Sequence, residues 1–576
     1  MQMSNQDNNL IKYSSSYFLS YLIKLIGNKF RIILLILLAT PILGLGKLYG
    51  QEVFTRQDTL RGSITEERAW WDLNYYHLKV KVHISDSTIS GENLVQYTVL
   101  DNGEVMQIDL QQPLKITEVT QNGEDLDYIR EGSAFFIRLK SKQDPGDVNR
   151  VLVKYSGKPI VAENPPWDGG FTWTEDSNGK PFVATSNQGI GSSVWWPNKD
   201  HPYDEPDSMR ISITTPGDLM DVSNGRLEGV DEHRNGTKTW NWFVSNPINN
   251  YGVNINIGDY IHFGETYDGE KGKLTLDYYV LRENEEKARE QFKQVKPMME
   301  AFEYWFGPYP FYEDGYKLVE APYLGMEHQS SVTYGNGYEN GYRGRDLSGS
   351  GWGLKFDFII IHETGHEWFA NNITYADVAD MWVHEGFTNY SESLYLDYHF
   401  GTQAANEYVQ GLRLGILNDR PLMGTHGVYH RGSGDMYNKG GNLLHTLRQV
   451  ANNDSLWRET LRGLNRAFYH QTVHSKQVEE FISKSFRRDL SNVFDQYLRD
   501  TRIPTLEYAF RDGRLTFRWG NAVEGFDLPV DVEINGEETR IFPTTSWKWI
   551  DVKSAEVSNL TVDPNYYVGS FNLLGK

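Results

Sequence analysis

Two histidines and two glutamates stand at a spacing that suits metal chemistry. The stretch Ile359–Tyr395 contains His362, Glu363 and His366 in the pattern H-E-x-x-H, and Glu385 follows after eighteen intervening residues. An α-helix turns once per about 3.6 residues, so both imidazoles project from one face, as two nitrogen ligands of a tetrahedral zinc ion must. Glu363 is placed to take a proton from metal-bound water, and Glu385 on a second helix would supply a third ligand. These residues predict a catalytic zinc site with one Zn²⁺ per chain.

The helix that carries the motif is expected to lie in the protein core. Ile359-Ile360-Ile361 stand directly before it, and burying two histidines and two glutamates without a metal would be costly. The pentapeptide also occurs by chance, and the competing interpretation is a pair of surface histidines on an amphipathic helix.

Length and composition favour a large, acidic, globular protein. At 576 residues, three or four domains of about 150 residues each are expected. Hydrophobic residues make up 39% of the chain and aromatic residues 14%, which is enough for large cores. The net charge of −21 argues against a nucleic-acid partner, because phosphate binding needs basic patches. The chain has no cysteine, which excludes disulfides, cysteine zinc sites, thiol catalysis and a lipid-modified cysteine.

The first 51 residues have the character of an export signal. Lys29 and Arg31 precede the apolar run Ile32–Gly46, which Pro41 interrupts. A run of about fifteen apolar residues is short for a membrane span and typical of a signal peptide. Residues 1–51 are therefore expected to be a signal peptide, and the alternative is an uncleaved N-terminal anchor. Either way the body is expected to be exported (periplasmic, secreted or membrane-anchored), with membrane contact only through an uncleaved segment.

Residues 60–265 are expected to form an N-terminal, mostly antiparallel β domain. Leu78, Val80 and Val82 alternate with polar residues, as in a half-buried strand, and further short runs are separated by Gly, Asn, Asp and Pro clusters.

Two more domains are expected after it. Residues 266–500 contain helical spacing, first over Glu285–Phe306, and predict a mainly helical domain that carries the metal motif. Residues 501–576 return to strands, with turns at Asp512-Gly513 and Asn535-Gly536, and predict a small C-terminal β-sandwich. The expected fold class is a multidomain α+β protein.

Together these residues closely resemble the aminopeptidase N family of zinc metallopeptidases, which also contains the leukotriene epoxide hydrolase. The H-E-x-x-H motif followed after eighteen residues by glutamate is that family's zinc signature. The words W-x-x-E-G-F around Glu385 and W-F-A-N-x-I/V-T after His366 also match. The resemblance runs from about Trp70 to Leu498. It implies a thermolysin-like catalytic domain and peptide substrates, and it leaves the oligomeric state open.

The resemblance also points to an exopeptidase loop before the zinc helix. The family segment G-A-M-E-N corresponds here to Leu324-Gly325-Met326-Glu327-His328. An aminopeptidase must pair its substrate's ammonium group with a carboxylate, and Glu327 is the candidate. The alternative is a solvated loop glutamate. His328 replaces the usual Asn and Leu324 the usual Gly, so the contacts of the neighbouring subsite are expected to differ.

The resemblance, together with position on the helix of Glu385, points to three more candidate site residues. The family stabilises the oxyanion with a tyrosine in a Y-x-K-G segment, here Tyr437, whose alternative role is in the core or at the surface. A Gln or Glu of the β domain binds the substrate's amino end; the candidate is Gln188, and the alternative is a simple loop amide. Glu392, seven residues after Glu385, is expected to orient a zinc-binding imidazole, unless it is an exposed helix glutamate. The remaining histidines, among them His384, His426 and His430, have no spacing that requires a metal.

The expected function is a zinc aminopeptidase that hydrolyses the N-terminal residue from peptides. Glu363 would act as general base and acid, Tyr437 would hold the oxyanion, and Glu327 with Gln188 would bind the amino end. The alternatives are a zinc endopeptidase or an epoxide hydrolase of the same family, and a non-catalytic scaffold. The scaffold is disfavoured because all the expected zinc ligands and Glu363 are intact.

Overall fold

The computed structural model describes residues 53–552 and 559–574, and every element discussed below lies in the unit Arg56–Lys576. The expected signal peptide or anchor, residues 1–51, lies outside the described residues. Within the described ranges, no helix combines the length and apolar character needed to span a membrane. Two short helices, α3 (Arg56–Gly62) and α4 (Glu66–Ala69), begin the unit.

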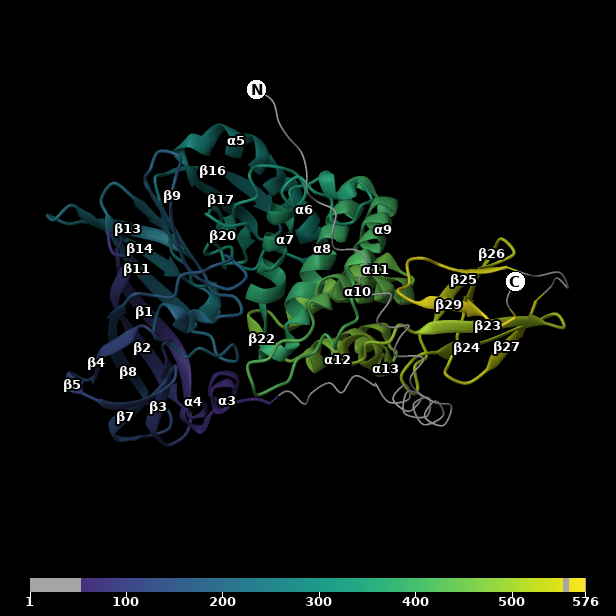
Figure 1. Cartoon of the computed structure of the whole chain (residues 1–576), viewed down its shortest axis with the longest axis horizontal. Helices are drawn as coiled ribbons and strands as arrows, with labels where there is room; N and C mark the ends of the chain where they lie inside the picture. The colour runs from purple at the N-terminus through teal and green to yellow at the C-terminus, as the bar shows by residue number, and fades with distance from the viewer. Residues whose placement is uncertain (1–52, 553–558, 575–576) are drawn as a thin grey trace, which may run out of the picture. The chain divides into compact units, whose positions relative to one another are not determined.

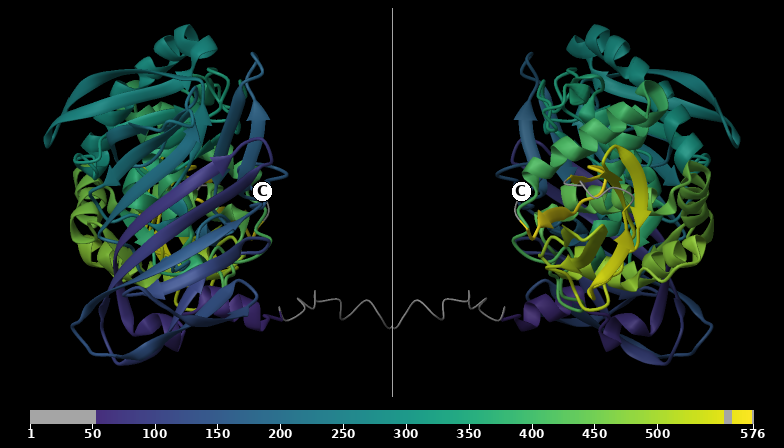
Figure 2. Two further views of the ribbon diagram at one scale, coloured as in Figure 1. Left: turned by 90° about the vertical axis from the view of Figure 1, so that its left-hand side faces the viewer. Right: turned by 90° about the vertical axis from the view of Figure 1, so that its right-hand side faces the viewer.

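The N-terminal region is built on a large twisted sheet, whose purple and blue strands lie side by side (Figure 1; Figure 2, left). In β1, Leu78, Val80 and Val82 are buried while the residues between them face outwards, because successive side chains of a strand point to opposite faces. Neighbouring strands pair antiparallel, except that β1 pairs parallel with β11. The order across the sheet is β13 (Arg226–Glu232), β14 (Thr237–Val244), β11 (Ser208–Pro216), β1 (Trp71–His83), β2 (Thr88–Val99), β8 (Val148–Gly157), β4 (Lys115–Gln121) and β5 (Glu124–Asp125).

Two smaller sheets complete this region. The first has the order β12 (Met220–Val222), β15 (Asn256–Gly258), β10 (Pro181–Ser186) and β9 (Gly170–Glu175). The second has the order β3 (Gly103–Asp109), β7 (Ala134–Gln143) and β6 (Asp127–Glu131). Trp195 and Trp196, which follow β10, are completely buried in the core of this region. β10 matters for the site because the loop at its end carries Gln188.

A five-stranded sheet is built from strands on both sides of the helical segment Glu285–Phe306, and its first strand contains the boundary expected between the first two domains. Its order is β16 (Tyr260–Gly269), β17 (Gly272–Leu281), β18 (Tyr316–Glu320), β20 (Val332–Tyr334) and β19 (Gly325–Met326). The boundary predicted between residues 265 and 266 falls inside β16, which pairs along its whole length with β17. Both regions have the alternating pattern of strands, so the sequence does not indicate where one sheet ends and the next begins.

The helical region contains α5 (Glu285–Gln291), α6 (Val295–Phe306), α7 (Phe358–Gly365), α8 (Trp382–Phe400), α9 (Thr402–Gly411), α10 (Asn438–Ala451), α11 (Asp454–Ala467), α12 (Ser475–Phe486) and α13 (Ser491–Phe494). The helix predicted over Glu285–Phe306 is divided by a tight turn at Phe292–Gln294. Pro297 explains the division, because it has no N–H to bond the carbonyl of Lys293 and its ring crowds that carbonyl.

A short parallel pair connects two distant parts of the helical region. β21 (Ile373–Tyr375) pairs with β22 (Gln471–Val473), so the segment that leads into α8 lies beside the segment that leads into α12.

The C-terminal region is a β module of two sheets, drawn in yellow in Figures 1 and 2. One has the order β27 (Lys548–Asp551), β24 (Arg514–Gly520), β23 (Thr505–Arg511) and β29 (Gly569–Asn572); the other has β26 (Glu537–Ile541), β25 (Val530–Ile534) and β28 (Leu560–Val562). Its core is continuous with that of the helices, and the Tyr497 hydroxyl donates to the carbonyl of Tyr567 at 2.8 Å. The predicted α+β class is confirmed, with a β-rich N-terminal region, a helical region and a C-terminal β region.

Candidate active site

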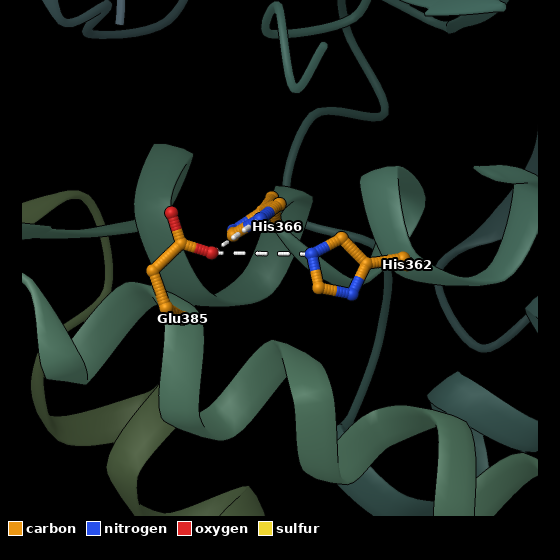
Figure 3. A group of neighbouring side chains, drawn as sticks. All are labelled: His362, His366 and Glu385. Atoms are coloured by element: carbon orange, nitrogen blue, oxygen red, sulfur yellow. Dashed lines mark ion pairs between the residues drawn. The ribbon is translucent and has the colours of Figure 1, made fainter. Parts of the chain in front are cut away.

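Three side chains converge where α7 meets α8, as Figure 3 shows. Nε2 of His366 lies 3.4 Å, and Nε2 of His362 3.9 Å, from Oε2 of Glu385 in the first turn of α8. Bonds of about 2.0–2.2 Å to a tetrahedral zinc ion place neighbouring ligand atoms roughly 3.4 Å apart. The distance from His366 to Glu385 equals this separation, the distance from His362 to Glu385 exceeds it by about 0.5 Å, and all three donor atoms lie within 4.8 Å of one another.

Local backbone structure positions the two histidines. The carboxylate of Asp357 caps α7 by accepting from the backbone N–H groups of Ile359 and Ile360 at 3.1 and 3.4 Å. The helix ends at Gly365 with His366 as its C-cap, and the chain then leaves helical geometry at Phe369. This turn brings the Phe369 carbonyl to 3.1 Å from Nδ1 of His366. A proton on Nδ1 leaves the Nε2 lone pair free for a metal.

Glu392 fixes the other imidazole. Nδ1 of His362 donates to Oε1 of Glu392 at 2.7 Å, and the Tyr408 hydroxyl donates to Oε2 at 2.6 Å. The Glu392 side chain is completely buried, so the alternative of an exposed helix glutamate does not apply. A carboxylate that accepts a hydrogen bond from a ligand histidine sets the tautomer and the ring orientation of that histidine.

The electrostatics of this group favour a cation. Oε2 of Glu385 is buried, accepts no hydrogen bond of normal geometry within the described ranges, and faces the two imidazole nitrogens. Burial lowers the pKa of His366, but the carboxylates of Glu385, Glu327 and Glu363 raise it to about 10. Burial raises the pKa of Glu385, but the His366 and His362 imidazoles bring it to about 2. Two imidazoles and a carboxylate suit Zn²⁺, so these residues fit the predicted metal.

The other predicted site residues surround the same pocket, which has a volume of about 340 Å³. Besides the three candidate ligands, Glu363, Glu327, Gln188 and Tyr437 line it. The structure therefore brings together side chains from the β-rich region, the five-stranded sheet and three helical segments.

Glu327 and Gln188 form a direct link to the candidate metal ligands. Nε2 of Gln188 donates to Oε1 of Glu327 at 2.6 Å and to Oε1 of Glu385 at 2.8 Å. Glu327 is only 2% exposed, so it is not a solvated loop glutamate. Burial raises its pKa to about 7; Glu385 and Glu363 add to this, whereas His366 opposes it. Nδ2 of Asn371 donates to the Glu327 carbonyl at 2.9 Å and holds the backbone in place.

Gly325 allows the strand that carries this loop to pack directly on α7. A Cβ atom at position 325 would lie 2.7 Å from Cγ2 of Ile359 and 3.1 Å from Cγ of Glu363. Of the two departures from the family segment, Leu324 lines the pocket, whereas His328 is completely buried. Nδ1 of His328 lies 3.4 Å from Oγ1 of Thr333, and burial lowers its pKa to about 3, so the imidazole is neutral.

Tyr437 and Glu363 have environments that suit proton donation and proton transfer. The Tyr437 ring stacks on His362 with centroids 6.0 Å apart. Burial and the Glu385 and Glu327 carboxylates raise the pKa of Tyr437 well above its ordinary value, so the phenol keeps its proton. Glu363 is 9% exposed, and burial raises its pKa against the opposing effect of the two imidazoles.

Several supporting residues were not predicted from the sequence. The ring of Phe358 stacks on His362 with centroids 5.0 Å apart, and Oγ1 of Thr388 lies 3.0 Å from Nδ1 of His366. Thr388 stands three residues after Glu385 on the same helix, a spacing that could have indicated it. Tyr408 lies on another helix, and nothing in its sequence context marks it. His384 is buried, and its Nε2 accepts from the backbone of Tyr375 at 2.8 Å.

Comparisons with known proteins place these observations in a family context. Residues 291–497 match the model of the peptidase family M1 domain. The chain is 20% identical over 466 residues to probable aminopeptidase 1 of Saccharolobus solfataricus, covering 77% of this chain and 56% of that protein. It is 20% identical over 469 residues to aminopeptidase N of Lactococcus lactis subsp. lactis, covering 76% of this chain and 52% of that protein. The chain thus spans just over half the length of these curated relatives.

A solved structure shares the fold. It is a mutant M1 zinc metallopeptidase from Deinococcus radiodurans, bound to a Tyr-Ser-Ala substrate. The TM-score is 0.62 at 20% identity, and the match covers 75% of this chain and 95% of that one.

Proposed function

We propose that the protein is a zinc-dependent aminopeptidase of the peptidase family M1, because residues 291–497 match the model of that family's domain. It removes the N-terminal residue from peptides. The observation that carries the proposal is the bridge made by Gln188, whose amide contacts both Glu327 and the candidate ligand Glu385. The Glu327 carboxylate, which would bind the substrate's ammonium group, is thus connected to the candidate metal ligand Glu385 through the single side-chain amide of Gln188. Such a short separation favours cleavage one residue from the chain end.

His362, His366 and Glu385 are the residues that would hold the zinc ion. When bound, zinc supplies a Lewis acid that lowers the pKa of a coordinated water to about 7 and polarises a carbonyl group. Glu392 and the Phe369 carbonyl keep the two imidazoles in the tautomer that presents Nε2.

The chemistry of the remaining residues follows from their protonation states. Glu363 accepts a proton from the attacking water and then delivers it to the leaving amine. Tyr437 keeps its proton and donates a hydrogen bond to the substrate carbonyl oxygen as negative charge develops there. The Glu327 carboxylate and the side-chain oxygen of Gln188 bind the substrate's ammonium group, which orients the first peptide bond towards Glu363.

Peptides are the proposed substrate class. The Deinococcus structure is described as bound to a Tyr-Ser-Ala substrate, and the Saccharolobus and Lactococcus relatives are named as aminopeptidases. These names describe those proteins, and they support the same class of substrate here.

The test compares a reporter that has a free aminoacyl group with its N-acetylated form. We expect hydrolysis of the free form, loss of activity with a zinc chelator, recovery with added Zn²⁺, and loss of activity in Glu363→Gln. Equal hydrolysis of both reporters would favour an endopeptidase. An epoxide substrate consumed without peptide cleavage would favour the epoxide hydrolase. Zinc binding without any hydrolysis would indicate the non-catalytic scaffold.

Export remains a proposal based on Lys29, Arg31 and the apolar run Ile32–Gly46. Fractionation of cells that express the full chain tests it. Activity confined to the cytoplasm would contradict it.

A further inference from the structure

A second group of side chains of the types that bind metals lies outside the pocket. Asp380, His426 and His474 place one potential ligand atom each within 4.8 Å of the others. Nε2 of His426 lies 3.1 Å from both carboxylate oxygens of Asp380, and Nδ1 of His474 lies 3.0 Å from Oδ2. None of the three lines the pocket of the candidate active site.

The fold brings these residues together through backbone hydrogen bonds. The parallel pairing of β21 with β22 continues in the bond from the Ala376 N–H to the Val473 carbonyl, at 2.8 Å. His474 therefore follows directly beside the turn that ends in Asp380. The third segment is attached to the same turn, because the Gly424 N–H donates to the Ala379 carbonyl at 2.9 Å.

We propose that Asp380, His426 and His474 form a second site for a divalent transition metal of the zinc class. Two imidazoles and one carboxylate are the donor types that zinc accepts, and the observed separations are close to the roughly 3.4 Å between ligands of a tetrahedral ion. The Asp380 side chain is 1% exposed, whereas those of His426 and His474 are 49% and 55% exposed. A buried carboxylate under two half-exposed imidazoles leaves the remaining coordination position open to water.

The tautomers needed for metal binding are available to both imidazoles. The nitrogens that face Asp380 are Nε2 of His426 and Nδ1 of His474, and the His474 side chain also accepts from the backbone N–H of Gln477 at the start of α12. Each ring can carry its proton on its other nitrogen, Nδ1 of His426 or Nε2 of His474, and present a lone pair to the ion. The preference is for Zn²⁺, Co²⁺, Ni²⁺ or Cu²⁺ over Mg²⁺ or Ca²⁺, since imidazole suits the former group.

The surrounding charges are compatible with a cation. Arg499 is the nearby positive group, but its guanidinium donates to Glu479 at 2.6 and 3.1 Å and to Asp495 at 3.2 Å. Asp377 adds a further carboxylate on the turn that carries Asp380, and it accepts from the Gly427 N–H at 2.8 Å.

A bound ion would join three segments that meet at the start of α8. Asp380 stands two residues before α8, whose first turn carries Glu385. We expect occupancy to stabilise the fold, because the ion binds the assembled cluster and not the unfolded chain.

The test is a zinc count on the full chain. The protein is equilibrated with excess Zn²⁺ and passed over a desalting column, and bound zinc per chain is measured by mass spectrometry. We expect two zinc ions in the wild type and one in Asp380→Asn and in His474→Gln. The matched control is His233→Gln, which changes another exposed histidine and should keep two ions.

Two further measurements separate this site from the proposed catalytic one. The double variant His362→Gln/His366→Gln should keep one ion, and its Co²⁺ form should show visible absorption that His474→Gln added to it removes. His474→Gln alone should retain aminopeptidase activity and lose the rise in melting temperature produced by the second equivalent of zinc. A wild type that holds one ion, or a His474→Gln variant that holds two, would overturn the proposal. The cluster would then be a hydrogen-bonded set only.

Discussion

Glu327 is the residue whose replacement tests chain-end recognition most directly. Glu327→Gln keeps the shape of the side chain and an oxygen that can accept from Gln188, but it removes the negative charge. The side chain is buried between Gln188 and the backbone anchored by Asn371, so the variant should retain the loop geometry. The change therefore isolates the attraction between a carboxylate and the ammonium group of the substrate.

The expected loss follows from the burial of that carboxylate. Removing one partner of a buried, hydrogen-bonded charge pair costs about 2–4 kcal/mol, which corresponds to a decrease of roughly 30- to 1,000-fold in kcat/KM. An exposed ion pair would contribute less than about 1 kcal/mol, or roughly fivefold. Because Glu327 is 2% exposed, we expect the larger value.

The assay measures kcat/KM for a free aminoacyl reporter and for its N-acetylated form. In Glu327→Gln, the value for the free reporter should fall by the factor above, while that for the acetylated reporter should change by less than about twofold. Glu339→Gln is the matched control, because Glu339 is an exposed glutamate in the loop that follows. A variant that keeps the wild-type preference for the free reporter would refute the assignment of Glu327. An equal loss on both reporters would show a general structural effect instead.

Three further predictions concern two residues of the candidate site and one buried histidine of α10, His445. Tyr437→Phe should lower kcat by about 10²- to 10³-fold with little change in KM, and an unchanged kcat would exclude the tyrosine as the oxyanion donor. Glu392→Gln should weaken zinc binding by about 10- to 100-fold, as measured by competition with a chelator, because the acceptor of the His362 imidazole loses its negative charge; unchanged affinity would contradict this. Burial lowers the pKa of His445 to about 3 from about 6.5 in the unfolded chain, so its contribution to stability is present above pH 6.5 and is lost as the pH falls towards 3. Between pH 7 and 3, the unfolding free energy of the wild type should therefore fall by about 3–5 kcal/mol more than that of His445→Gln. Denaturant titrations at several pH values measure this difference, and an equal fall in both proteins would refute the prediction.

The metal motif on α7 was predictable because its geometry depends only on residues that are close together in the sequence. His362, Glu363 and His366 occupy one helical turn, and a spacing of four residues determines that both imidazoles share a face. The strands of the first sheet were predictable for the same reason, since alternation in β1 reports the two faces of a single strand. The three buried isoleucines correctly indicated a core helix.

Features that depend on pairing between distant segments were not predictable. His426 and His474 lie 46 and 94 residues from Asp380, and only the pairing of β21 with β22 brings the second histidine to the carboxylate. Spacing alone therefore gave no reason to assign a metal to His426. Strand β16 likewise crosses residue 265, where the boundary between the first two domains is expected, and strand alternation does not indicate which sheet a strand joins.

Charge balance explains why the proposed site would select a free amino end. Glu327, Glu363 and Glu385 put three carboxylates around one buried pocket, and their mutual repulsion contributes to the raised pKa values of Glu327 and Glu363. A zinc ion brings two positive charges and a substrate ammonium group brings the third, and together these balance the three carboxylates that line the pocket. An acetylated peptide leaves one buried carboxylate without a counter-charge, and Glu327 must then take up a proton or remain unpaired. Because Gln188 bonds to both Glu327 and Glu385, the group that recognises the chain end and the group that would hold the metal belong to one hydrogen-bonded unit. Selectivity for a free amine thus follows from the number of carboxylates that share this pocket, independently of which side chain the substrate carries.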